Sequence, residues 1–333
     1  MQKRRLGRNG PEVSALGLGC MGMSHLYGPA DDAESIATIR AALDAGITYI
    51  DTGDFYGMGH NEMVVRRALE GRRDRAFVAV KFGAMRDPSG AFIGYDARPI
   101  AVKNFLAYTL KRLGTDYVDL YMPARVDPQV PIEDTVGAIA DMIKAGHVRH
   151  LGLSEAGAAT VRRAHAVHPV AALQIEYALA SRGVEAEILP ALRALGVSMT
   201  AYGVLSRGLL SGSVKDTAAL APHDIRRHYP RFAKDNLAAN LRLVAALETA
   251  ARDLGATPTQ LAFAWVLARG DDIVPLVGAR RRDQLAEALG ALDLKLGAAD
   301  LAHLEAAVPA EAIAGGRYAP AAMAQLDSEK RAG

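Results

Sequence analysis

Three side chains with complementary chemistry lie near the ends of two apolar runs. Asp51 and Lys81 each follow such a run, and Tyr56 lies five residues after Asp51. The phenol of tyrosine has an ordinary pKa of about 10, and a neighbouring ammonium group lowers that pKa by stabilising the phenolate. Lys81 can be that group, with Asp51 as its counter-ion. Together they predict Tyr56 as a general acid that protonates an oxygen atom while hydride arrives at the attached carbon.

The same residues also have a structural interpretation, a buried Asp–Lys pair with a tyrosine packed beside it. For three isolated residues, that interpretation is the better one. The catalytic interpretation also requires that parallel strands bring the three side chains to one edge of a sheet. The rest of the chain therefore decides between the two interpretations.

Composition bounds the class of protein. The chain has 333 residues, half of them apolar, which suits two ordinary domains or one large α/β barrel. Lys and Arg number 39 against 37 Asp and Glu, so a nucleic-acid partner is not expected. The single cysteine, Cys20, excludes an internal disulfide and is compatible with a reducing compartment. No apolar run has the length of a signal or membrane segment, so we expect a cytoplasmic protein with no membrane partner.

Strand-like runs alternate with helical patterns along most of the chain. A hairpin is expected over residues 3–15, turning at Asn9-Gly10. The apolar runs that follow end near Gly19, Asp51, Lys81, Met122, Ser154, Gln174, Tyr202 and Val277. Helices are expected over 32–45, 61–69, 101–113, 132–145 and 184–195, with an extra helix near 236–268.

This β-α repeat of about eight units predicts a (β/α)8 barrel, the TIM-barrel form of the α/β class. We expect one domain over residues 1–333, with the barrel at about 16–290 and a C-terminal tail at about 308–333. Functional loops should lie at the C-terminal face of the strands. No grouping of His, Cys, Asp and Glu has zinc-ligand spacing, so no metal is expected.

The glycines at 17, 19 and 22 raise a competing interpretation. They match the G-x-G-x-x-G fingerprint of dinucleotide-binding turns. In that turn the last glycine should already open a helix, whereas here a loop follows and the next helix is expected only from about residue 32. A small-residue loop after the first barrel strand explains the glycines better.

Several motifs, taken in order, resemble the aldo-keto reductase family. They are Gly19-Cys20-Met21-Gly22-Met23-Ser24, the stretch 51–57, Lys81, Asp119-Leu120-Tyr121 with Arg125-Val126-Asp127-Pro128, and Gly152-Leu153-Ser154-Glu155. The similarity runs from about residue 4 to residue 290 and is closest to bacterial, yeast and plant members related to potassium-channel β subunits. It implies the barrel already predicted, and hydride transfer between a nicotinamide cofactor and a carbonyl compound.

The resemblance implies the same catalytic roles as the residues themselves, with Tyr56 as proton donor, Lys81 lowering its pKa and Asp51 as partner of Lys81. The family usually has a histidine after its fourth strand, but this chain has Ala124 there. The similar pattern Ala-Arg-x-Asp occurs in members that resemble pyridoxal reductases. The leading hypothesis is NADPH-dependent reduction of an aldehyde or ketone, such as a pyridoxal-like aromatic aldehyde. The alternative is an NADPH-binding redox sensor or regulatory barrel with weak turnover.

For the cofactor, the resemblance assigns the nicotinamide amide to three polar residues, Ser154, Glu155 and Gln174. Tyr202 offers a flat face on which the nicotinamide ring can stack. Arg207 and the backbone amides near Gly208 are expected along the pyrophosphate. Ser154 or Gln174 alone could equally well satisfy loop backbone, and the ordered set is what favours a cofactor site.

A helix should open just after the last strand. Its N-terminal amides and a nearby arginine would form an anion site, which in this family takes the adenosine 2′-phosphate, so NADP(H) is favoured over NAD(H). The residues expected there are Gly278, Arg280, Gln284 and Glu287. The alternative is that the three consecutive arginines at 280–282 form a solvated face.

The partner expected at the open end of the barrel is a small-molecule carbonyl compound. The residues assigned to its pocket are Met21, Met23, Phe55, Ala124 and Arg125. Methionines and aromatic residues are also ordinary core residues, so their types alone do not identify a pocket. A homo-oligomer is compatible with the sequence, which names neither the physiological substrate nor the direction of the reaction.

Overall fold

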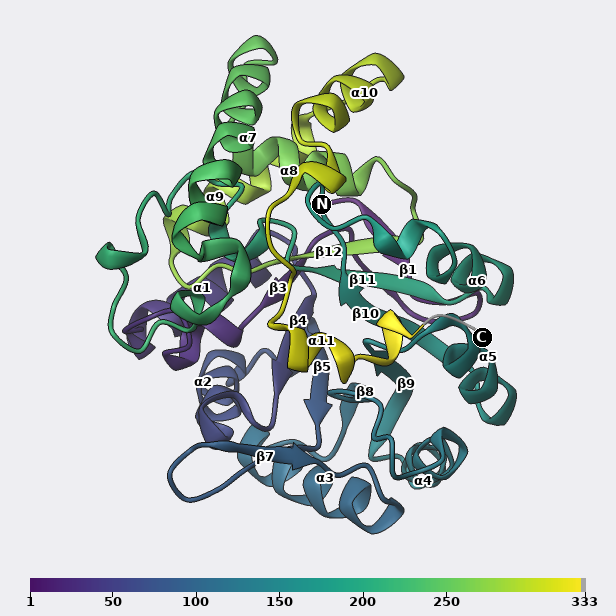
Figure 1. Ribbon diagram of the computed structural model, residues 1–333. Helices are drawn as coiled ribbons and strands as arrows, with labels where there is room; N and C mark the ends of the chain where they lie inside the picture. Colours follow the sequence, from purple (N-terminus) through teal and green to yellow (C-terminus); the bar gives the residue numbers. More distant parts are fainter. Residues whose placement is uncertain (331–333) are drawn as a thin grey trace.

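Eight parallel strands form a closed barrel in the computed structural model, which describes residues 1–330 (Figure 1). Around the ring they are β3 (Gly17–Gly19), β4 (Tyr49–Gly53), β5 (Phe77–Phe82), β8 (Val118–Pro123), β9 (Val148–Ser154), β10 (Val170–Glu176), β11 (Ser198–Tyr202) and β12 (Ile273–Val277), and β12 closes on β3. Each predicted strand end lies at or near an observed one. The predicted (β/α)8 barrel is confirmed.

Helices follow most strands and surround the barrel (Figure 1). They are α1 (Asp32–Asp44), α2 (His60–Leu69), α3 (Pro99–Leu113), α4 (Ile132–Lys144), α5 (Ala158–Val167), α6 (Ile188–Leu195), α7 (Lys234–Asp253), α8 (Pro258–Leu267), α9 (Arg282–Leu289), α10 (Ala298–Ala307) and α11 (Pro320–Ala324). None of the helices within residues 1–330 has both the length and the apolar character that crossing a bilayer requires.

The segment expected as one helix near 236–268 is two helices, α7 and α8. Thr257 accepts a hydrogen bond from the backbone of Gln260, and the Gln260 side chain accepts one from the backbone of Thr257. This reciprocal cap, with Pro258 in the first turn, starts a new helix rather than continuing the old one. Helix α5 was not predicted by the sequence pattern.

Two hairpins flank the barrel. Strands β1 (Lys3–Arg5) and β2 (Glu12–Ser14) form the predicted N-terminal one. Leu6 and Val13 from this hairpin pack with the residues that fill the barrel, which include Tyr49 and Phe77. A second hairpin, β6 (Ala84–Arg86) with β7 (Phe92–Tyr95), follows β5 and was not predicted from the sequence.

The glycine-rich run at residues 17–22 belongs to the barrel. Gly17 and Gly19 lie in β3, and the next element is a short 3-10 helix, Met21–Ser24, rather than an α-helix. Helix α1 begins only at Asp32. The dinucleotide-turn interpretation is therefore wrong for this run, and the barrel-loop interpretation is confirmed.

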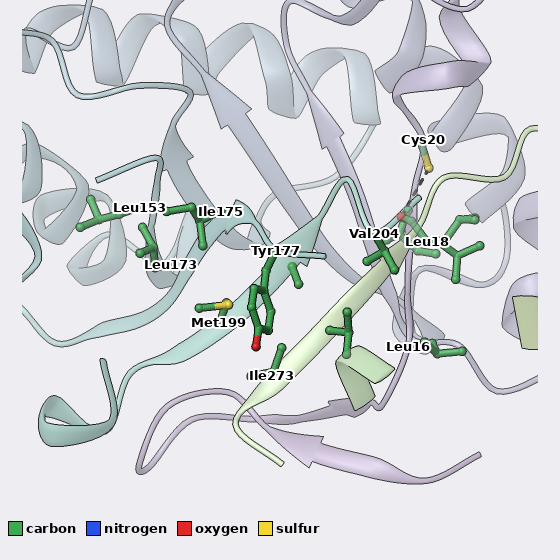
Figure 2. Packing of buried hydrophobic residues seen from close by; sticks show 14 of the residues in the cluster. Leu16, Leu18, Cys20, Leu153, Leu173, Ile175, Tyr177, Met199, Val204 and Ile273 are labelled. Carbon is green, nitrogen blue, oxygen red and sulfur yellow. Dashed lines mark hydrogen bonds between the residues drawn. The ribbon is translucent and has the colours of Figure 1, made fainter. Parts of the chain in front are cut away.

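The alternation of side chains along the strands decides which residues face the barrel axis. On β5, Phe77 and Ala79 belong to the inner cluster, whereas Val78 and Val80 pack outward. Because side chains alternate with a period of two residues, Lys81 at the end of this strand also points inward. Figure 2 shows part of the outward-facing layer, where residues such as Leu153, Leu173 and Met199 pack beneath the helices.

The chain after α10 returns across the barrel. In Figure 1 this yellow segment, which carries α11, overlies the strands in the middle of the view. Its contacts, described below, hold it against the ends of β8, β9 and β11. We call residues 317–329 the C-terminal strap. The tail expected at 308–333 is thus an ordered cover over most of its length, and residues 331–333 lie outside the described part of the chain.

Candidate active site

A buried ion pair lies at the C-terminal end of the barrel. The Lys81 ammonium donates to both carboxylate oxygens of Asp51, at 2.6 and 2.7 Å. The Gln174 amide donates to Asp51 Oδ1 at 2.7 Å. Only 4% of the Asp51 surface and 3% of the Lys81 surface are exposed, so each charge depends on the other for compensation. The predicted pairing of Asp51 with Lys81 is present in the structure.

Tyr56 lies beside this pair. It opens a short 3-10 helix just after β4, and the Lys81 Nζ atom is 5.1 Å from the centre of its ring. Burial, and then the charge of Asp51, raise the pKa of the Tyr56 phenol well above its usual value, while Arg125 acts to lower it. The expected net lowering of this pKa is therefore wrong for the protein without cofactor. The physical reason is that Tyr56 is buried and the charge of Lys81 is already balanced by both oxygens of Asp51.

The polar residues expected around the nicotinamide lie on neighbouring strands. Ser154 on β9 is directly opposite Gln174 on β10, and both are buried. Tyr202 ends the next strand, β11, and its ring packs against the inner cluster of the barrel. The barrel therefore brings Ser154, Gln174 and Tyr202 to the same end as Asp51 and Lys81.

Glu155 has a different environment from the one expected. Its backbone is in the left-handed region, with φ 53°, and its side chain is fully buried. Both oxygens are bound by Arg317 of the strap, at 2.8 and 2.6 Å, and further hydrogen bonds come from the Tyr202 and Ser328 hydroxyls, each at 2.7 Å. Burial alone would raise the pKa of Glu155, but Arg317 lowers it to about 2. Glu155 anchors the strap, so its assignment to the nicotinamide amide is not supported.

A second anchor holds the long segment after β11. Arg207 and Arg231 from this segment both pair with Glu176 at the end of β10, at 3.4 and 3.2 Å. The Arg207 guanidinium also lies over two tyrosine rings, 4.1 Å from the centre of Tyr229 and 4.7 Å from that of Tyr318. Cation–π contacts of this kind stabilise partly buried arginines. Arg207 thus joins the segment to the strap, a role that sequence reasoning did not predict.

The loop after β12 carries the residues expected near the adenosine. The Arg280 side chain donates to the carbonyls of Tyr27 and Pro29 at 2.8 and 3.2 Å, and Gln284 accepts from the Arg280 backbone at 3.2 Å. Gly278 is exposed, and a Cβ atom added to it would meet no other atom within 4 Å. Glu287 is exposed on α9. This loop and the first loop of the barrel therefore meet around Arg280.

The other two arginines of the run at 280–282 have carboxylate partners. Arg281 pairs with Asp283 at 2.9 Å, and Arg282 pairs with Glu34 at 2.9 Å. The hydrogen bonds of the Arg280 side chain within residues 1–330 go only to backbone carbonyls. The solvated-face interpretation therefore fits Arg281 and Arg282, and Arg280 is the one of the three whose charge is left for an anion.

One of the five residues assigned to the substrate pocket lies in the hydrophobic core. Met23 is fully buried in the core between strands and helices, so its assignment to the pocket is wrong. Phe55 packs edge-on against Tyr56, with ring centres 4.8 Å apart. Met21 lies in the loop after β3 and is partly exposed. Ala124 and Arg125 follow β8, and the Arg125 guanidinium donates to the Tyr318 hydroxyl at 3.2 Å.

Arg317 and Tyr318 are the site residues that sequence reasoning missed. Neither belongs to a strand end, and the strap was expected only as a tail. The available signal was an arginine and a tyrosine side by side in a segment that follows two glycines, Gly315 and Gly316. Among the described residues, no group of three or more His, Cys, Asp and Glu side chains is arranged to hold a metal ion.

Comparison with known proteins agrees with this geometry. Residues 15–309 match the aldo/keto reductase family. The chain is 41% identical over 322 residues to "Probable aldo-keto reductase 1" of Glycine max, covering 96% of this chain and 92% of that protein. It superposes on the glycerol dehydrogenase AKR11B4 of Gluconobacter oxydans with a TM-score of 0.82 at 28% identity, covering 92% and 94% of the two chains.

A second solved relative is an aldo/keto reductase of Klebsiella pneumoniae in complex with NADP and acetate. The superposition has a TM-score of 0.73 at 27% identity and covers 93% of this chain and 96% of that one. The resemblance to the family is confirmed. The finer resemblance to potassium-channel β subunits and to pyridoxal reductases stays a prediction.

Removing Arg317 should destabilise the protein because it leaves Glu155 buried without its cation. We expect Arg317→Gln to lower the free energy of unfolding by about 3–5 kcal/mol, and Glu155→Gln with Arg317→Gln to restore part of that loss. Urea unfolding measures both. Arg163→Gln, which breaks the exposed pair with Glu133, should cost less than about 1 kcal/mol. Equal effects of the two single changes would contradict the anchoring role of Arg317.

The pair of Glu155 and Arg317 makes the free energy of unfolding depend on pH. The pKa of Glu155 is lowered from 4.5 to about 2. Its contribution to stability is therefore complete above about pH 4.5 and is lost as the pH falls toward 2. The difference between the wild type and the double variant should shrink over that range.

Proposed function

We propose, from the premise that the chain belongs to the aldo/keto reductase family, that it reduces an aldehyde or ketone to an alcohol with NADPH and with Tyr56 as proton donor. The observation that carries this proposal is the position of Tyr56 beside the buried pair of Asp51 and Lys81, at the strand ends where Ser154 and Gln174 also lie. The family makes the chain an NADP-dependent oxidoreductase. The geometry supplies the candidate acid.

The residues divide the chemistry between them. NADPH, when bound, supplies the hydride that adds to the carbonyl carbon. Tyr56 gives its proton to the carbonyl oxygen as negative charge develops there, and it regains a proton from solvent afterwards. The raised pKa of Tyr56 keeps the phenol protonated before the reaction. The charge of Arg125 then limits the cost of the phenolate that remains.

The described residues fit this cofactor. Ser154 and Gln174 can pair with the nicotinamide amide, and Tyr202 can support the ring. Arg280 carries a charge that only backbone carbonyls satisfy within residues 1–330, and it lies just before helix α9, where backbone amides add to the attraction for a phosphate. The open space at Gly278 leaves that surface accessible.

Tyr56→Phe should leave NADPH binding nearly unchanged and lower kcat by about 100-fold or more, the usual effect of removing a positioned acid. Phenylalanine keeps the ring, so the packing against Phe55 is retained. Stopped-flow absorbance of NADPH under single-turnover conditions and a fluorescence titration of NADPH measure the two quantities. An unchanged rate would exclude Tyr56 as the donor.

Arg280→Ala should weaken binding of NADPH far more than binding of NADH, because only NADPH has the 2′-phosphate that the guanidinium can pair with. Fluorescence titrations with the two cofactors measure the ratio of their dissociation constants. Arg281→Ala is the matched control, since Arg281 is exposed and already paired with Asp283. If Arg280→Ala weakens both cofactors equally, the phosphate site lies elsewhere.

A second candidate function is an NADPH-dependent redox sensor that turns over slowly. Two observations favour it, the alanine at position 124 and the strap that covers the end of the barrel through Glu155 and Tyr202. The same single-turnover measurement distinguishes the two candidates. A sensor would oxidise bound NADPH far more slowly than a metabolic reductase with every aldehyde in a broad panel.

For the substrate, we propose an aromatic aldehyde that carries a hydroxyl group next to the aldehyde, as pyridoxal does. Without a histidine at position 124, an ordinary aldehyde lacks the imidazole donor, and one such donor is typically worth about 3–4 kcal/mol in the transition state. An ortho hydroxyl can donate to its own carbonyl, and Ala124 leaves room for the ring.

Pyridoxal and salicylaldehyde should therefore be better substrates than their O-methylated or unsubstituted analogues, compared as kcat/KM. Ala124→His should narrow this difference by improving simple aldehydes and crowding the substituted ones. A wild-type protein that shows no preference for the ortho-hydroxy compounds would overturn this choice of substrate. It would leave the reductase activity itself unaffected.

A further inference from the structure

A cation lies at the end of β8, next to the position where the family has its imidazole. Arg125 follows Ala124 directly, and its Nη1 atom donates to the Ala124 carbonyl at 2.6 Å. Its Nη2 atom donates to the Tyr318 hydroxyl at 3.2 Å, and the guanidinium carbon is 5.8 Å from the centre of the Tyr318 ring. The guanidinium is thus held between the strand end and the strap.

The charge of Arg125 has no direct counter-ion in the described part of the chain. Both of its hydrogen bonds go to uncharged oxygens, and its buried Nε atom has no partner within residues 1–330. Glu155 is already bound at both oxygens by Arg317. The other arginines buried at this end, Arg207 and Arg231, share Glu176. A buried donor and an unbalanced charge are both costly, so an arriving anion would relieve both costs.

A chain of hydroxyl groups fixes the orientation of this guanidinium. The Tyr202 hydroxyl donates to Glu155 at 2.7 Å, which leaves its oxygen free to accept from the Tyr318 hydroxyl, also at 2.7 Å. The Tyr318 oxygen can then accept from Arg125. Every hydroxyl hydrogen in the chain points toward Glu155, so these phenols offer no hydrogen to a substrate. The buried Nε–H of Arg125 is a donor that has no partner within residues 1–330.

We propose that Arg125 binds an ionised oxygen carried next to the reacting carbonyl, so that anionic carbonyl compounds such as 2-oxo carboxylates form a second class of substrates. This inference rests on the reductase activity proposed above. Arginine is suited to the task because its planar donors match a carboxylate and its charge persists at any ordinary pH. Arg125 also acts electrostatically on Tyr56. Lys81 on β5 is paired with Met122 on β8, three residues before Arg125, so Arg125 lies at the same end of the barrel as Lys81 and Tyr56.

This recognition differs from internal donation by an ortho hydroxyl. A carboxylate at neutral pH accepts hydrogen bonds and has no hydrogen to donate, so it cannot assist its own carbonyl. A carboxylate next to the carbonyl makes a compound a better substrate only if the protein supplies a cation. Phenylglyoxylate and its methyl ester form a suitable pair, because the ester is the more electrophilic ketone and would be the better substrate without such recognition.

The experiment compares kcat/KM for phenylglyoxylate and methyl phenylglyoxylate with saturating NADPH. We expect the wild type to favour the carboxylate by roughly 10-fold or more, the scale of a hydrogen bond to a charged group. Arg125→Gln should remove this preference and Arg125→Lys should keep part of it. Arg86→Gln, which removes an exposed cation on β6, should leave the preference unchanged.

The outcomes separate the inference from its premise. A wild type that reduces the ester and simple aldehydes but does not favour phenylglyoxylate overturns the role of Arg125, whatever the variants do. A preference that survives in folded Arg125→Gln, verified by its thermal melting curve, overturns it as well. If no carbonyl compound oxidises NADPH, the proposed function itself fails and this inference fails with it.

Discussion

The closure of the parallel sheet is the constraint on which the site depends. In a closed ring of parallel strands, every carboxyl end lies at the same face, and side chains that alternate inward and outward leave one inward position at each strand end. Asp51, Lys81, Ser154, Gln174 and Tyr202 occupy such positions although they are spread over much of the sequence. Their proximity follows from the register of the barrel and needs no local motif.

Ion pairs hold the segments that lie over the C-terminal ends of the barrel strands. Carboxylates at three strand ends each hold cations, with Lys81 on Asp51, Arg317 on Glu155, and Arg207 with Arg231 on Glu176. The pair at Glu155 attaches the strap, and the pairs at Glu176 attach the long segment after β11, to the rigid strands. Arg125 and Arg280 remain with uncharged partners in the described chain. The ion pairs within the protein thus hold the surroundings of the site in place. Arg125 and Arg280 are the cations that remain suited to anionic groups of ligands.

Much of this arrangement could be predicted from sequence. Strand ends were accurate because apolar runs stop at polar or glycine residues, and the order of β-α units limits the topology to one fold. Asp51 and Lys81 were paired correctly for the same reason. The pKa of Tyr56 was not predicted correctly, because burial is a property of the packed chain and outweighs a neighbouring charge that is already balanced.

The strap was beyond sequence reasoning for a related reason. Arg317 binds a carboxylate 162 residues earlier, and no periodic pattern relates the two. The resemblance assigns Glu155 to the nicotinamide amide, whereas in the structure its two oxygens are bound by Arg317. Met23 was assigned to the pocket, but its side chain packs in the core. Residue type and position in the chain do not say in which direction a side chain leaves the backbone.

The position of the strap also bears on how the protein is made. All eight strands precede residue 278, and Arg317 follows the end of β12 by 40 residues, since 317 minus 277 is 40. At about 5–20 residues per second, synthesis of that interval takes roughly 2–8 s. During those seconds every strand has been synthesised while the strap has not, and Glu155 lacks its cation. A chain whose barrel closes within this interval has no cover over the strand ends, and a cofactor in the surrounding solution can then enter before the cover exists.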